Sequence, residues 1–153
     1  MELQLFGINH KTSKLSEREL FIINDSNQDD FINFFKKEFG HFVDSFFSLS
    51  TCNRTEVYYF GEPGTSISVA QKTLEFLGCD DIVRDGLYFF DDEAAIEHMC
   101  CVASGLDSQV LGEQEILGQF KKSVQNYTKL GFLNNQLLRV TDEIISIAKA
   151  ART

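Results

Sequence analysis

A short polar link between two apolar runs constrains the fold of this chain more than any other feature. The run Phe46–Leu49 leads into the link, and the alternating run Val57–Phe60 follows it. Apolar runs this close together are typical of two antiparallel strands joined by a tight turn. The link, Ser50–Glu56, contains a single cysteine, Cys52, with an arginine, Arg54, two positions later. We therefore expect a β-hairpin with an exposed thiol at its tip.

The patterns on either side of this hairpin predict the other elements of residues 1–90. Alternating polar and apolar residues over Glu2–Ile8 predict a first strand, and Leu87–Phe90 predict a last one. A capping-box spacing at Ser16–Glu19 opens a short helix, a phenylalanine stripe over Phe31–Phe39 predicts a second helix, and Ile67–Leu77 a third. The resulting order is β-α-β-β-α-β. It indicates an α+β fold, a ferredoxin-like sandwich with helices on one face of an antiparallel sheet.

Helical patterns continue through the rest of the chain. They cover Ala94–Ala103, Glu115–Leu130 and Leu133–Ala151. We therefore divide the chain into a ferredoxin-like core at residues 1–90 and a helical extension at residues 91–153. The last helical pattern reaches Thr153 without a stop signal, which favours a chain that continues into a longer protein.

Composition and charge narrow the classes of function. A net charge of −9 argues against a general nucleic-acid-binding surface, because phosphate affinity rests on lysine and arginine, although a small basic patch remains compatible with it. The sequence has no apolar run long enough to span a bilayer, and Met1–Gln4 lacks the layout of a signal peptide, so we expect a cytoplasmic protein without membrane contact. No cysteine pair has CxxC spacing, which predicts free thiols and no metal site at the four cysteines Cys52, Cys79, Cys100 and Cys101.

Cys52 is the candidate nucleophile of this sequence. A thiol reacts as the thiolate, and a nearby cation such as Arg54 favours that form. His98 is the only histidine in the helical half of the chain. Its chemistry suits it either to donate a proton to a leaving oxygen or to hold the thiolate of Cys52.

A second polar segment, Ser104–Gln119, mixes glycine and polar residues with apolar ones in a way that core packing does not require. A site for an amino acid needs an acidic acceptor for the ammonium group, a cation for the carboxylate, and neutral donors that orient the ligand. Glu113, Arg54, and Ser108 with Gln119 fit these three roles.

Three motifs of this chain resemble those of the glutamyl-tRNA reductases, in the same order and at similar separations. They are Gly7–Thr12, Ser50–Glu56 and Ala103–Gln119. The final segment, Ile147–Thr153, also resembles the helix that leads into the nucleotide domain of that family, so the resemblance covers essentially the whole chain. Those enzymes use NADPH to reduce glutamate carried on its tRNA to glutamate-1-semialdehyde, which begins tetrapyrrole (5-aminolevulinate, porphyrin) biosynthesis.

The resemblance implies roles for individual residues. Cys52 corresponds to the nucleophile that forms a glutamyl thioester, and His98 to a histidine important for activity. The implied substrate-binding residues are Thr51, Asn53, Arg54, Ser108, Glu113, Gln114, Glu115 and Gln119. The family commonly has Pro and Gln where this chain has Gln114 and Glu115, and Ala-Pro where it has Ser13-Lys14.

The resemblance also implies partners. The partner is glutamyl-tRNA(Glu), and the full-length protein is expected to be a homodimer, whereas these 153 residues alone are expected to be monomeric. The chain has no G-x-G-x-x-G between a strand and a helix, so NADPH is expected on a following domain, and this chain is expected to acylate or hydrolyse but not to reduce. From the residues alone two other functions stay open: a nucleotide-independent cysteine hydrolase or acyltransferase, and a non-enzymatic module that binds an amino acid as a regulatory signal.

Overall fold

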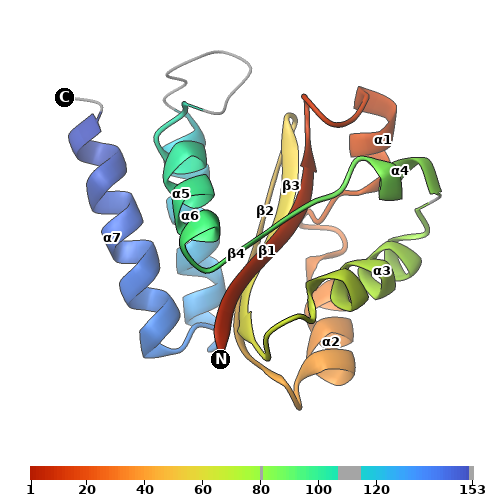
Figure 1. Ribbon diagram of the computed structural model, residues 1–153, viewed down its shortest axis with the longest axis horizontal. Coiled ribbons are helices and arrows are strands. Elements are labelled where there is room, and N and C mark those ends of the chain that lie inside the picture. The colour runs from red at the N-terminus through yellow and green to blue at the C-terminus, as the bar shows by residue number, and fades with distance from the viewer. Residues whose placement is uncertain (80, 107–114, 152–153) are drawn as a thin grey trace.

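A computed structural model describes residues 1–79, 81–106 and 115–151. It contains a four-stranded sheet with helices on both faces (Figure 1). The elements in chain order are β1 (Glu2–Asn9), α1 (Leu15–Leu20), α2 (Gln28–Phe39), β2 (Val43–Thr51), β3 (Arg54–Gly61), α3 (Ser66–Leu77), α4 (Asp81–Asp85), β4 (Tyr88–Asp91), α5 (Asp92–Ala103), α6 (Glu115–Lys129) and α7 (Asn135–Ala151).

The sheet has the strand order β2-β3-β1-β4, and every neighbouring pair is antiparallel. This order and the sequence β-α-β-β-α-β define the ferredoxin-like sandwich, so the predicted fold class is confirmed. The predicted hairpin is also confirmed, because β2 and β3 pair up to Thr51↔Arg54 at their shared end. The hairpin tip therefore lies at one end of the sheet.

One face of the sheet is covered by α2 and α3 (Figure 1). Phe31, Phe35 and Phe39 recur every four residues along α2, and all three are buried. Phe35 stacks on Phe46 of β2 with ring centroids 4.4 Å apart. Burying each such ring contributes about 2 kcal/mol, so the predicted phenylalanine stripe anchors α2 on the sheet.

The other face of the sheet is covered by the C-terminal helices. Helix α5 packs on β1, α6 on β2, and α7 against α5 and α6. Phe120 of α6 meets the ring of Phe47 edge-on at 5.7 Å, and Phe47 stacks on Tyr58. The expectation of helices on one face is therefore incomplete, because the helical extension forms a third layer. The candidate site lies between this layer and the sheet.

Two local predictions differ from the structure. Helix α1 begins at Leu15 rather than after Ser16, because the backbone N–H of Lys14 donates to Glu17 Oε1 at 2.7 Å and closes the first turn two residues earlier than predicted. Helix α4 was not predicted. It has only five residues and one buried side chain, Val83, which is too little to produce a helical period.

Candidate functional site

Cys52 lies at the tip of the β2–β3 hairpin. Strand β2 ends at Thr51 and β3 begins at Arg54, so Cys52 and Asn53 form the turn. The N–H of Asn53 donates to Thr51 Oγ1 at 3.1 Å, which tightens this turn. Cys52 is an exposed free thiol, as the sequence predicts. The thiol is therefore accessible from solvent.

Arg54 is not exposed beside Cys52 but points onto the buried face of the sheet. Its side chain is only 1% exposed, and its Nη1 lies 3.5 Å from Glu56 Oε2. Side chains two residues apart on a strand project from the same face, which brings this pair together. Arg54 is thus part of a buried ion pair within the layer under α5 and α6.

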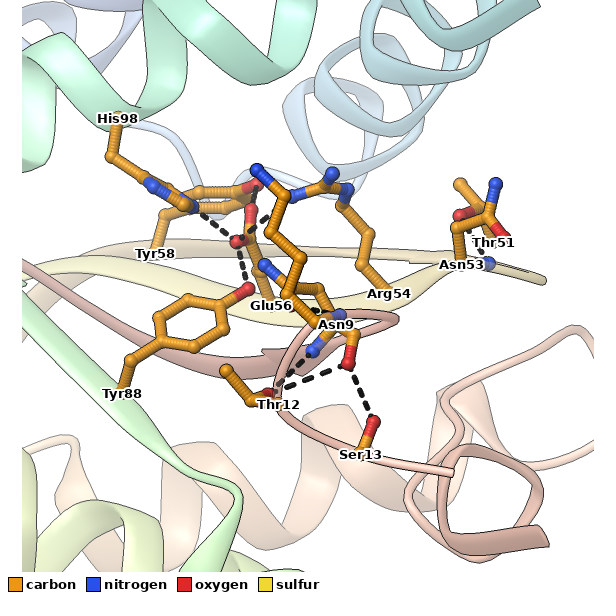
Figure 2. A network of polar contacts seen from close by, with 11 residues as sticks. Asn9, Thr12, Ser13, Thr51, Asn53, Arg54, Glu56, Tyr58, Tyr88 and His98 are labelled. Carbon is orange, nitrogen blue, oxygen red and sulfur yellow. Dashed lines mark hydrogen bonds and ion pairs between the residues drawn. The ribbon is translucent and has the colours of Figure 1, made fainter. Parts of the chain in front are cut away.

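Glu56 is the centre of a polar cluster that the sequence analysis did not predict. Figure 2 shows its carboxylate surrounded by side chains from β3, β4 and α5. The hydroxyls of Tyr58 and Tyr88 donate to it, and His98 Nε2 is hydrogen-bonded to it. Arg54 completes the set. Because the carboxylate is fully buried, these contacts replace the water that it gives up on folding.

The electrostatics of this cluster favour an ionised Glu56. Burial by itself raises the pKa of Glu56, but the hydrogen bond and charge of His98, the charge of Arg54 and the hydrogen bond from Tyr58 together lower it below its ordinary value. Burial and the charge of Glu56 in turn raise the pKa of Tyr58 well above its ordinary value. The ionised carboxylate therefore accepts hydrogen bonds from Tyr58 and Tyr88 and holds His98 and Arg54 in place.

His98 enters the cluster from α5. Its ring stacks on Phe90 with centroids 4.7 Å apart and lies beside Tyr88 at 5.2 Å. The side chain is 12% exposed. The structure thus joins His98 to Glu56 and leaves a small part of its side chain exposed.

Gly7 of β1 provides the space that Glu56 occupies. The two residues pair across the β1–β3 ladder, and a Cβ on Gly7 would lie 2.4 Å from the backbone oxygen of Thr55 and 2.7 Å from Glu56 Cγ. Such distances are too short for any real contact, so the sheet excludes a side chain at this position. Glycine here is a requirement of the buried carboxylate.

Gly7→Ala is accordingly expected to lower the free energy of unfolding by about 2 kcal/mol, because the ladder must shift to admit the methyl group. Urea denaturation of the purified chain measures this loss. Gly118→Ala is the matched control, since a Cβ on Gly118 of α6 meets no atom within 4 Å. The control is expected to match or slightly exceed wild-type stability. Equal stability of the two variants would contradict the packing described.

The remaining predicted site residues are distributed differently. Ser108, Glu113 and Gln114 lie outside the described residues, as does Asp107. Glu115 is exposed at the start of α6. Gln119, one turn later, lines a cavity of about 420 Å³ together with Ser50 of the edge strand β2 and Lys122. Among the described residues, then, Arg54 and His98 meet at Glu56, whereas Gln119 lies beside the edge strand.

The described part of the chain lacks three features: a metal-binding group, a parallel sheet and a membrane-spanning helix. No group of three or more His, Cys, Asp or Glu side chains there is arranged to hold a metal ion. A dinucleotide site of the usual kind needs parallel strands joined through a helix, and this sheet has antiparallel neighbours throughout. The described sheet therefore lacks the parallel-strand arrangement of that kind of dinucleotide site. None of the described helices has the length and hydropathy needed to cross a membrane.

Comparison with known proteins places the chain in a family. The family described as "Glutamyl-tRNAGlu reductase, N-terminal domain" matches residues 6–153. Among solved structures, the glutamyl-tRNA reductase from Methanopyrus kandleri is similar at 33% sequence identity and a TM-score of 0.75. The alignment covers 98% of this chain and 34% of that structure, so the chain spans about a third of its length.

Proposed function

Since this chain belongs to the family of glutamyl-tRNA reductase N-terminal domains, we propose that it is the acylating part of such an enzyme in tetrapyrrole biosynthesis. The observation that carries the proposal is an exposed thiol, Cys52, at the tip of the same hairpin that bears the buried Arg54–Glu56 pair. The substrate is glutamyl-tRNA(Glu), and the product of this half-reaction is a glutamyl thioester.

In the proposed reaction the thiolate of Cys52 attacks the ester carbonyl that joins glutamate to the 3′ end of the tRNA. A carbon–sulfur bond forms, the carbon–oxygen bond to the ribose breaks, and the ribose oxygen takes up a proton. A thiolate is a strong nucleophile, and a thioester keeps the acyl group reactive for the next step. The exposure of Cys52 supports this role, because the acceptor end of an RNA must reach the sulfur.

His98 is the group to which we assign proton delivery. Its hydrogen bond to Glu56 fixes the ring, as a carboxylate does for the catalytic histidine of a triad. Its partial exposure leaves the ring within reach of a bound substrate. Positioned proton transfer of this kind contributes roughly 100-fold to 10,000-fold in rate.

Arg54 is the group to which we assign the carboxylate of the substrate glutamate. A guanidinium carries several N–H donors in a planar fork, which suits it to bind Glu56 and a substrate carboxylate together. Thr51 and Asn53 flank the nucleophile. The family resemblance adds Ser108, Glu113, Gln114, Glu115 and Gln119 as further substrate contacts.

In the proposed pathway the thioester is then reduced by hydride from NADPH. We assign that step to polypeptide outside residues 1–153, in line with the greater length of the Methanopyrus structure. The prediction for this chain alone is acyl transfer, followed by slow hydrolysis of the thioester.

A single-turnover assay tests the proposal. With the chain in excess over glutamyl-tRNA, deacylated tRNA is expected to appear in a single phase stoichiometric with the substrate. His98→Asn is expected to slow this phase by about 100-fold or more, whereas His41→Asn, at an exposed histidine outside the cluster, is expected to leave its rate unchanged. Equally rapid cleavage of a small glutamate ester without RNA would favour a general cysteine hydrolase. Glutamate binding with no release of tRNA would favour a regulatory module.

A further inference from the structure

We propose that Arg18 of α1 is a positioning residue for Cys52: it fixes the hairpin turn so that the sulfur approaches the substrate carbonyl in one orientation. This inference rests on the proposed function of Cys52. The observation behind it is a pair of hydrogen bonds from one guanidinium. Arg18 Nε donates to the backbone oxygen of Cys52 at 3.1 Å, and Arg18 Nη1 donates to the backbone oxygen of Ser13 at 2.8 Å.

The backbone carbonyl of Asn53, the second residue of the turn, also accepts a hydrogen bond from the segment that follows β1. The backbone N–H of His10 donates to the oxygen of Asn53 at 2.9 Å. Both residues of the turn, Cys52 and Asn53, therefore give their carbonyl oxygens to the segment that follows β1. These bonds add to the pairing of Thr51 with Arg54 and fix the turn relative to the loop that follows β1.

The segment that holds the turn is itself well ordered by hydrogen bonds around Asn9. The backbone oxygen of Asn9 accepts from Thr12 N at 3.1 Å and from Ser13 Oγ at 2.6 Å, and its Oδ1 accepts from Lys11 N at 2.9 Å. Asn9 also pairs with Arg54 in the β1–β3 ladder. Figure 2 shows the bonds of Asn9 to Thr12 and Ser13 next to the Glu56 cluster. Arg18 thus connects Cys52 to a loop that is anchored beside the substrate-binding residues.

This arrangement matters for the rate because acyl transfer is sensitive to the placement of the nucleophile. Reacting atoms must lie about 3–3.5 Å apart with their orbitals aligned, and an error of about 1 Å costs roughly 100-fold in rate. Helix α1 has no buried residue, so Arg18 joins it to the turn by hydrogen bonds rather than by core packing. Removing the guanidinium releases the turn without opening the core.

Arg18→Gln in the 153-residue chain tests this role. At saturating glutamyl-tRNA, the acylation rate constant is expected to fall by about 10-fold to 100-fold while KM changes by less than about twofold. Alkylation of Cys52 by iodoacetamide, a small reagent that needs no such alignment, is expected to change by less than about twofold. Arg84→Gln is the matched control, because Arg84 is an exposed arginine of α4 whose ion pair with Asp81 is long, at 3.9 Å.

Hydrogen exchange separates this inference from the function on which it rests. Backbone amides of residues 49–56 are expected to exchange about tenfold faster in Arg18→Gln than in wild type, with α5 unchanged. Wild-type acylation or unchanged exchange in Arg18→Gln would overturn the positioning role, as would an equal loss of iodoacetamide reactivity. Failure of the proposed function would appear instead as no acylation by the wild-type chain, and the exchange measurement would still decide the role of Arg18.

Discussion

Glu56→Gln is expected to lower the free energy of unfolding by about 3–5 kcal/mol at neutral pH, because it removes the carboxylate charge that faces the buried guanidinium of Arg54. Arg54 is 1% exposed and Glu56 fully buried, so water cannot replace the lost interaction. The amide also presents an NH₂ group to the hydroxyls of Tyr58 and Tyr88, which donate to the carboxylate in the wild type. Urea denaturation measures the loss. Acylation should fall with it, since Glu56 holds both Arg54 and His98.

The pH dependence of the free energy of unfolding tests the role of Glu56 independently. The pKa of Glu56 is lowered in the folded state, so its contribution is fully present above its unfolded pKa, about 4.3, and is lost as the pH falls through the folded value. Between pH 6 and pH 3 the wild type should therefore lose more stability than Glu56→Gln does.

The matched control for Glu56 is Glu38→Gln. Glu38 forms an exposed ion pair with Lys72 at 3.7 Å. Its substitution is expected to lower the free energy of unfolding by less than about 1 kcal/mol. A Glu56→Gln variant as stable as Glu38→Gln at pH 7 would contradict the role given to the buried carboxylate.

Cys52→Ser is expected to reduce acyl transfer from glutamyl-tRNA by roughly three orders of magnitude or more, as removal of the nucleophile does in covalent catalysis. A serine hydroxyl is a weak nucleophile without a base to activate it. The fold is expected to be unaffected, with a change in stability below about 0.5 kcal/mol, because Cys52 is exposed. Cys101→Ser is the matched control, since Cys101 is a second exposed thiol. Loss of activity in both variants would mean that the activity does not depend on Cys52 alone, which would contradict its role as the single nucleophile.

The sequence was sufficient to predict most of the fold because the relevant patterns are local. Alternation over β1 and around Cys52 predicts strands, and the stripe Phe31–Phe39 predicts the face of α2 that is buried. The third layer was not predicted, because periodicity shows that a helix has an apolar face but not which surface that face covers. Helix α1 begins earlier than predicted because the backbone N–H of Lys14 and the side chain of Glu17 close its first turn. The donor is a backbone group, so the residue type at position 14 does not reveal it.

The site was predictable only in part. The exposure of Cys52 follows from its place in the hairpin. Arg54 was expected beside the thiol because the two are close in sequence, whereas strand alternation directs Arg54 onto the buried face. Glu56 was missed because two of its partners, Tyr88 and His98, come from β4 and α5, which no short-range pattern connects to it. One signal was present: an acidic residue in an otherwise apolar strand must either be exposed or have partners.

Intact-protein mass spectrometry after mixing the chain with glutamyl-tRNA tests whether Cys52 accepts the glutamyl group. We expect an increase in mass by one glutamyl group on the wild type and on Cys101→Ser, its absence on Cys52→Ser, and its removal by mild hydroxylamine, which cleaves thioesters. A folded wild-type chain that leaves the tRNA ester intact and carries no adduct, or an adduct that persists in Cys52→Ser, would contradict the assignment of Cys52 as the nucleophile.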